Sequence, residues 1–284
     1  MFNVKRALYL VLAFIFQALT PVALAEKSAA SKELYFGSVA MATPAVMHLR
    51  LLPLTEYLSE TLQRPVNLKL SFDTPTAIKE VSDNAVHLAY LAPAAYIEAK
   101  NRGDVRLIAK AMTKEGGSFQ LMVVTKQDSP IRGIQDLAGK RFAFGDKAAV
   151  LQRAVVIGAG MPLERLGSYV FIGDVGNVVS GVMNGDFDAG ILKDTIARKW
   201  EGKGLKILHA SSALPPFNIA ASRNMDANLL AQVRGALLKL NVRNPEHAKI
   251  LQALDEQYTG FAPVKDREYD IVRKLIESLE KSAI

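Results

Sequence analysis

Short apolar runs alternate with amphipathic stretches along most of the chain. The amphipathic stretches repeat their apolar residues with the period of a helix, most clearly at 54–62, 148–159, 228–240 and 267–279. Pro53 is expected to kink or restart the first of these helices. The short runs predict strands at 34–39, 66–72, 87–91, 106–111, 120–125, 141–144, 169–172, 189–192, 206–209 and 218–221. This alternation predicts an α/β protein with mainly parallel sheets flanked by helices.

Two segments, 77–96 and 178–200, share one plan: a helix, a tight turn, a strand and a second helix. Their sequence identity is low, so we interpret them as similar architecture in two halves rather than as a repeat. We expect two lobes joined by the strands themselves, with crossings at 120–125 and 206–210. The predicted lobes are 33–119 together with 211–284, including the C-terminal helices, and 120–210. Two such sheet edges facing each other across a hinge form a closing ligand cleft.

The N-terminal 25 residues have the features of a secretory signal. Lys5 and Arg6 precede an apolar run at 7–19, and Ala23-Leu24-Ala25 forms a small-x-small cleavage site. The run is shorter than the roughly 20 residues that span a bilayer. The chain contains no cysteine, which excludes disulfides and a lipoprotein anchor. We expect a mature protein, free in the periplasm, that begins at Glu26.

Charge and composition argue against several functional classes. The formal net charge is +7, but the basic residues are spread along the chain instead of forming the stripe typical of nucleic-acid binders. The four histidines lack metal-ligand spacing, and neither a nucleophile elbow nor a phosphate loop is present. We expect no metal, no cofactor and no nucleic-acid partner. An enzyme on this fold remains the least favoured alternative.

Ligands of open α/β sheets bind beyond the carboxyl ends of the strands, so residues at those positions are the candidate site. Each also has a structural alternative. The tyrosines pack in cores as often as they line clefts, and the threonines are suited to helix capping. Asp146 can orient its own loop, and the Lys193–Asp194 pair can interact internally or with solvent. The candidates are Thr43, Thr74, Tyr90, Pro93, Tyr96, Asp146, Lys147, Ala148, Lys193 and Asp194.

Several segments are similar, in register, to one protein family. The chain resembles the phosphate/phosphonate-type substrate-binding proteins of ABC transporters. The resemblance implies a type II periplasmic binding-protein fold with a two-strand hinge, a small-molecule ligand and a membrane permease as partner. The segments that carry it are 33–39, PLTEYLSETLQRP at 53–65, YLAPAAY at 90–96, GIQDLAGKRFAFGD at 133–146, GDFDAGILK at 185–193 and GFAPVKDREYDIVR at 260–273.

The chain departs from this family where phosphonate binders carry a Ser/Thr-rich stretch and a His-Asp pair. Here Lys147 to Leu151 reads KAAVL, and the pair falls on Val175-Gly176. A buried dianion needs many charge-assisted donors to offset its desolvation. Either Lys147 and Arg153 replace the missing donors, or the ligand is not a phosphonate. We favour a different small polar or anionic ligand.

The remaining expectations concern role and closure. The leading interpretation is a monomeric binding protein that delivers its ligand to an ABC permease. The alternative is a sensory protein that docks on a membrane receptor or sensor kinase. A ligand favours closure only through contacts that the open form lacks. We therefore expect Tyr96 on one side of the ligand and Lys193 or Asp194 on the other.

Overall fold

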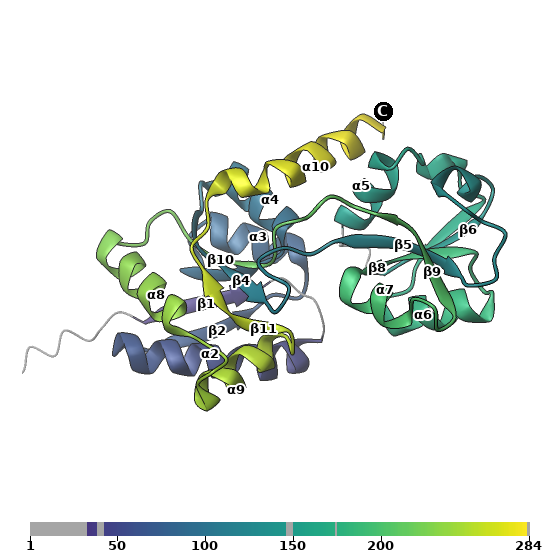
Figure 1. Ribbon diagram of the computed structural model, residues 1–284. Coiled ribbons are helices and arrows are strands. Elements are labelled where there is room, and N and C mark those ends of the chain that lie inside the picture. The colour runs from purple at the N-terminus through teal and green to yellow at the C-terminus, as the bar shows by residue number, and fades with distance from the viewer. Residues whose placement is uncertain (1–32, 39–42, 146–149, 174, 283–284) are drawn as a thin grey trace, which may run out of the picture. The chain divides into compact units, whose positions relative to one another are not determined.

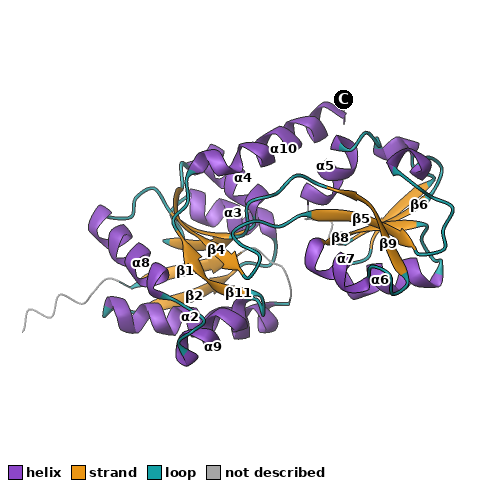
Figure 2. Ribbon diagram, in the orientation of Figure 1, coloured by secondary structure: helices purple, strands orange, loops and turns teal. Residues whose placement is uncertain are grey.

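Two β-sheets organise the computed structural model, which describes residues 33–38, 43–145, 150–173 and 175–282 (Figures 1 and 2). The predicted signal segment lies outside these residues. The first sheet has the order β11-β4-β10-β3-β1-β2, and the second has the order β7-β6-β8-β5-β9. The first sheet contains β1 (Leu34–Ser38), β2 (Val66–Leu70), β3 (Leu88–Leu91), β4 (Arg106–Thr113), β10 (Asn218–Ala221) and β11 (Tyr258–Ala262). The second contains β5 (Leu121–Lys126), β6 (Arg141–Phe144), β7 (Ser168–Phe171), β8 (Ala189–Lys193) and β9 (Leu205–Ala210).

The predicted two-lobed α/β class is confirmed, but the sheets are mixed. In the first sheet β1 pairs in parallel with β2 and β3, whereas β10 is antiparallel to β3 and β4. In the second, β6 pairs in parallel with β7 and β8, whereas β5 is antiparallel to β8 and β9. The strands β5 and β10 are the ones that the chain enters after passing from the other sheet. Such a strand arrives from the opposite side, so it runs against its neighbours.

The two connections between the sheets are paired with each other. They are residues 114–120, which follow β4, and 211–217, which follow β9; we call them the crossing segments. The backbone N–H groups of Phe119 and Leu214 donate to each other's carbonyl oxygens at 2.9 and 2.8 Å. The Gln120 side chain adds a bond to the Ser211 carbonyl at 2.6 Å. The expected crossings at 120–125 and 206–210 are largely strands of the second sheet, and the actual crossing segments lie just outside them.

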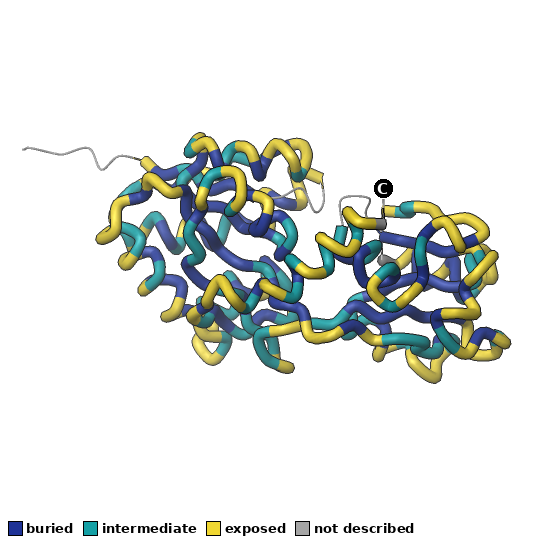
Figure 3. The backbone as a smooth tube through the Cα atoms, turned by 90° about the horizontal axis from the view of Figure 1, so that it is seen from above, coloured by how far each residue is buried: buried dark blue, intermediate teal, exposed yellow. Residues whose placement is uncertain are grey.

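Helices cover both faces of each sheet. On the first sheet, α2 (Pro44–Leu62), α8 (Ala227–Lys239) and α9 (Pro245–Leu254) share one buried apolar cluster, and α3 (Thr74–Ser82) and α4 (Pro93–Gly103) lie on the other face. On the second sheet, α6 (Val175–Asn184) and α7 (Asp194–Trp200) lie opposite α5 (Val150–Gly158). Short 3₁₀ helices occupy Ile134–Leu137, Leu163–Arg165 and Asp266–Tyr269. Figure 3 shows buried positions running through both sheets.

Three expectations about helices and strands need correction. Pro53 lies inside α2, which continues through it from Pro44 to Leu62. The last helix, α10 (Asp270–Ser282), contacts α5 of the second lobe as well as α4 of the first. Its apolar stripe, including Leu275, packs on α5 beside Gly158. The third correction is that β11 and α9 were not predicted. No helix among the described residues is long and apolar enough to cross a membrane.

Candidate ligand-binding site

A cavity of about 180 Å³ lies where the crossing segments meet the strand ends of both lobes. Its walls are mostly aromatic and apolar, and three charged side chains reach it. The lining residues are Arg50, Tyr90, Thr113, Ser118, Phe119, Lys193, Pro216, Phe217, Leu254, Asp255 and Tyr258. A second cavity of about 510 Å³ shares Arg50, Lys193, Leu254 and Asp255 with it and extends along the start of α7. We call the two together the hinge cavity.

The topology explains why these residues meet. Lys193 is the last residue of β8, and Tyr90 lies one residue before the end of β3. The carboxyl ends of the parallel strands mark one edge of each sheet, and the crossing segments bring these edges to one place. Tyr258 begins β11, and Asp255 follows the last residue of α9. The C-terminal return of the chain therefore completes the site.

Tyr90 and Tyr258 form the aromatic floor of the hinge cavity. Their hydroxyl oxygens are 2.6 Å apart, and the Tyr90 ring stacks on Phe217 with centroids 5.0 Å apart. Burial raises the pKa of Tyr90 well above its ordinary value, and Tyr258 and Asp255 add to the rise while Arg50 opposes it. Burial also raises the pKa of Tyr258. Both phenols are therefore neutral at physiological pH, and each carries a hydroxyl hydrogen that can be donated.

Lys193 supplies positive charge at the mouth. Its Nζ is 3.8 Å from Asp255 Oδ2 and 5.9 Å from the centroid of the Phe119 ring. Arg50 of α2 lines the same cavity and is solvent-exposed. Two cations against one carboxylate leave this wall with an excess of positive charge. Such a wall attracts anions, most strongly where aromatic side chains exclude water.

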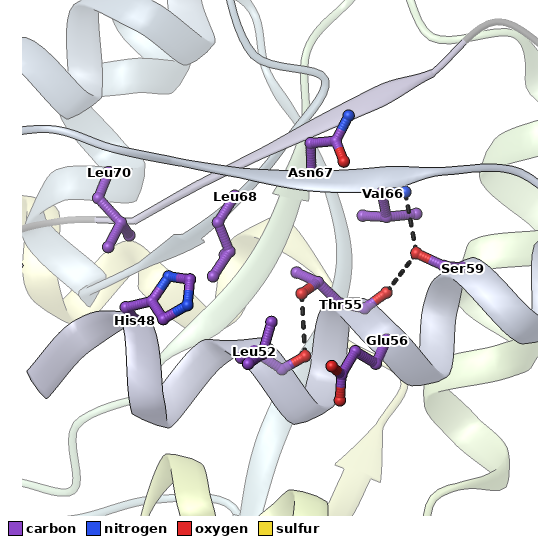
Figure 4. A pocket seen from close by; sticks show the side chains of 9 residues that line it. All are labelled: His48, Leu52, Thr55, Glu56, Ser59, Val66, Asn67, Leu68 and Leu70. Atoms are coloured by element: carbon purple, nitrogen blue, oxygen red, sulfur yellow. Dashed lines mark hydrogen bonds between the residues drawn. The ribbon is translucent and has the colours of Figure 1, made fainter. Parts of the chain in front are cut away.

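A larger cavity, about 590 Å³, lies between α2 and β2 (Figure 4). Its hydroxyls are already used inside the fold. Ser59 Oγ donates to the Thr55 carbonyl at 2.7 Å and accepts from the Val66 N–H at 2.9 Å, and Thr55 Oγ1 donates to the Leu52 carbonyl at 2.9 Å. Its lining contains no lysine or arginine. The hinge cavity therefore suits an anion better, although it is not the largest.

The structure brings two predicted site residues together, Tyr90 and Lys193. Tyr96 and Pro93 lie elsewhere: Pro93 is the buried first residue of α4, and Tyr96 is only 1% exposed. The Tyr96 hydroxyl donates to Asp266, and its ring centroid is 4.8 Å from that of Tyr269. Burial, reinforced by the bond to Asp266, raises the pKa of Tyr96. These contacts favour the core alternative for Tyr96.

Asp194 is committed to the backbone. Its Oδ2 accepts from the Gln120 N–H at 2.8 Å, and its Oδ1 accepts from the Thr195 N–H at 2.8 Å. The Asp194 N–H in turn donates to the Gln120 carbonyl at 2.9 Å. The side chain thus ties the end of β8 to the point where the first crossing segment enters β5. It is absent from the lining of the hinge cavity.

The threonines and the loop residues complete the predicted set. Thr43 occupies the N-cap position of α2 but makes no capping bond with its side chain. Thr74 is the first residue of α3, and Asp73 caps that helix by accepting from the Thr76 N–H at 2.7 Å. The proposed capping role is therefore wrong for the Thr74 side chain. Asp146, Lys147 and Ala148 lie outside the described residues.

Arg153, considered as a substitute donor, is held within the second lobe. Its guanidinium lies over the Phe171 ring, 5.8 Å from the centroid, and its Nε is buried with no hydrogen-bond partner in the described part of the chain. A cation stacked on a ring gains a modest electrostatic attraction there. The side chain does not line the hinge cavity.

Sequence reasoning missed Arg50, Phe119, Asp255 and Tyr258. The last two were missed because α9 and β11 were not predicted. One signal was present: Asn244-Pro245 is a capping residue followed by an N1 proline, and Asn244 Oδ1 accepts from the Glu246 N–H at 2.9 Å. A helix started there would have placed Asp255 at its end.

Comparison with known proteins agrees with this architecture. The phosphate-import protein PhnD of Mycolicibacterium smegmatis is 25% identical over 253 residues, 79% of each chain. XAC2383 from Xanthomonas citri has a TM-score of 0.75 at 17% identity, over 88% of this chain and 98% of its own. PhnD1 from Prochlorococcus marinus, solved with methylphosphonate, has a TM-score of 0.73 at 17% identity, over 88% and 99%. At such identities the two structures show the shared fold alone.

The family described as ABC transporter, phosphonate, periplasmic substrate-binding protein matches residues 36–269. This match spans most of the chain and includes both sheets and the hinge cavity. Members of the family are substrate-binding components and not enzymes. The chain therefore belongs to the phosphonate family of periplasmic substrate-binding proteins of ABC transporters.

Proposed function

We propose that this protein captures a small anionic solute in the hinge cavity and delivers it to the permease of an ABC transporter. The observation that carries the proposal is the placement of Lys193 and Arg50 on the wall of an aromatic cavity between the lobes. A cation in a partly dehydrated cavity binds an anion more strongly than a cation in open water does. The neutral phenols of Tyr90 and Tyr258 complement it as hydrogen-bond donors.

The cavity also bears on the size of the ligand. Pockets for drug-sized ligands occupy roughly 300–1,000 Å³. The inner part of the hinge cavity is about 180 Å³. A solute of a few non-hydrogen atoms suits this volume. The names of the relatives make inorganic phosphate and methylphosphonate the first compounds to test.

We propose weak or absent phosphonate binding. The residues at 147–151 offer no hydroxyl, and no histidine stands at 175–176. The described hinge cavity supplies Lys193, Arg50 and hydroxyl groups, fewer donors than a buried dianion needs to offset its desolvation. A monoanion loses less hydration on entry, so it is the favoured charge class.

Closure is the proposed mechanism of capture. Tyr90 and Arg50 belong to the first lobe, Lys193 belongs to the second, and Phe119 and Phe217 lie on the crossing segments. A ligand that touches both lobes favours the closed arrangement by its differential contacts. We propose lobes at 33–119 with 211–284 and at 120–210, moving about the paired crossing segments, in a monomer cleaved after residue 25. Intact mass and size-exclusion chromatography of periplasmic protein test the last two points.

The main experiment is a thermal-shift screen of small anions followed by calorimetry. A ligand that binds only the folded state raises the melting temperature by mass action, so the screen detects a binding solute whatever its identity. We expect a hit among small monoanions and weak or absent binding of phosphate, methylphosphonate and 2-aminoethylphosphonate. Sub-micromolar affinity for any of these three would show that the donors present suffice. A screen without any anionic hit would contradict the proposed function.

A further inference from the structure

Asp255 holds a carboxylate against the cation that the proposed function assigns to the ligand. Its two oxygens have separate tasks. Oδ1 accepts from the Gln257 N–H at 2.9 Å and orders the turn between α9 and β11. Oδ2 is 3.8 Å from Lys193 Nζ. Both side chains are about one-third exposed, at 33% for Asp255 and 32% for Lys193, so the pair is accessible from the hinge cavity.

We infer that Asp255 is a specificity-determining residue that discriminates against dianionic ligands in the hinge cavity. The inference rests on the proposed function, because it assumes an anion beside Lys193. Asp255 acts in two ways on such an anion. It competes for Lys193, which lowers the affinity of every anion by the same factor. It also repels the bound anion, and this repulsion grows with the charge of the anion.

The repulsive part creates selectivity between anions of similar shape. A dianion near a fixed carboxylate experiences about twice the repulsion of a monoanion at the same distance. The opposing attraction comes from Lys193 and from Arg50, which is exposed and therefore strongly screened. Asp255 thus shifts the preference of the cavity toward monoanions. This gives a second physical reason, apart from the missing hydroxyls, for weak binding of dianionic phosphonates.

The size of the effect follows from the exposure of the pair. Partly exposed ion pairs contribute at most about 1 kcal/mol, which corresponds to about two- to fivefold in an affinity. Replacing Asp255 by asparagine removes the charge, and an amide oxygen can still accept from the Gln257 N–H. We expect Asp255→Asn to bind monoanions about two- to fivefold more tightly. Dianions should gain about twice as much on a logarithmic scale, roughly four- to twentyfold.

Sulfate and methanesulfonate provide a matched pair of probes, since both are tetrahedral and their charges of two and one do not change near neutral pH. Calorimetry with both, and with phosphate and methylphosphonate, should compare wild type, Asp255→Asn and Glu246→Gln. Glu246 pairs with Lys249 at the exposed start of α9, so this variant makes the same charge change away from the cavity. We expect the sulfate-to-methanesulfonate affinity ratio to rise several-fold in Asp255→Asn and to stay unchanged in Glu246→Gln.

Lys193→Gln separates failure of this inference from failure of the proposed function. If wild type binds an anion, Lys193→Gln loses it and Asp255→Asn leaves the ratio unchanged, the role of Asp255 is overturned and the proposed function stands. An equal rise in Glu246→Gln has the same meaning, because it would reflect net charge alone. If no variant binds any of the four anions, the proposed function is overturned and the inference with it. Binding by Asp255→Asn alone supports the inference most directly.

Discussion

The turn after β3 and the turn after β8 have the same plan but different environments. Each follows a buried strand and leads into a helix, at Pro93–Gly103 in the first lobe and Asp194–Trp200 in the second. In the first, the aromatic residue Tyr96 is 1% exposed and is bonded to Asp266. In the second, Lys193 lines the hinge cavity and retains a third of its exposure.

The difference shows that a strand end becomes a binding position only when nothing else in the fold covers it. The segment from Asp266 to Arg273 returns over the first turn and supplies partners for Tyr96. Arg273 Nη2 binds Asp266 Oδ1 at 2.8 Å, and the Tyr269 ring packs beside Tyr96. A lysine remains partly solvated because burying an ammonium without full pairing is costly. The predictions below test this division between a structural turn and a binding turn.

The largest expected effect is on stability. Truncating Tyr96 to alanine removes a fully buried aromatic ring and should lower the free energy of unfolding by about 3–5 kcal/mol. Tyr96→Phe keeps the ring and loses only the hydrogen bond to Asp266, so a loss of about 1 kcal/mol is expected. Denaturant unfolding of both variants measures this. If Tyr96→Phe leaves stability intact and lowers ligand affinity, Tyr96 belongs to the site and the comparison fails.

Lys193→Gln should have the opposite profile. Losing a charge-assisted partner of the bound anion is expected to weaken binding by about one to two decades. The apo melting temperature should hardly change, because a pair exposed by about a third contributes little to stability. Calorimetry with the first anion found in the screen checks the affinity, and scanning calorimetry checks the stability. Unchanged affinity would remove Lys193 from the site.

Asp194→Ala sharpens the contrast within one turn. The substitution deprives the Gln120 and Thr195 N–H groups of an acceptor and should lower the free energy of unfolding by about 1–2 kcal/mol. Direct ligand contact is not expected, so any change in affinity should be smaller than in Lys193→Gln. Hydrogen exchange of the Gln120 amide reports the loss of its bond. A large affinity loss with full stability would instead place Asp194 in the cavity.

The smallest effect is a pH dependence at the structural turn. Burial by itself raises the pKa of Asp266, but hydrogen bonds from Tyr96 and Arg273 outweigh it and hold the pKa below the ordinary 3.8. A lowered pKa in the folded state stabilises the fold above the unfolded-state value, and this contribution is lost as the pH falls through the folded-state value. The penalty of Asp266→Asn should therefore be larger at pH 6 than at pH 3. Urea titrations at both pH values provide the measurement, and an equal penalty would show that the carboxylate charge is irrelevant.

The sequence by itself determined the local elements and the family. Ten of the strands were located to within about two residues, because buried strands need continuous apolar runs and turns need glycine, proline or asparagine. The motifs around YLAPAAY and GIQDLAGKRFAFGD fixed the family, and Lys193 and Tyr90 were identified from their positions at strand ends. These features depend on neighbours in the chain, which the sequence displays directly.

Only the tertiary structure decided which strand ends are covered and which side chains meet. Tyr96 and Asp266 are 170 residues apart, and Lys193 meets Asp255 only because α9 and β11 return beside the crossing segments. The stripe on α10 predicted a buried helix face, but the sequence did not show that this face lies on α5 as well as α4. Periodicity reveals that a face is buried and not what buries it, since the same apolar stripe fits any complementary surface.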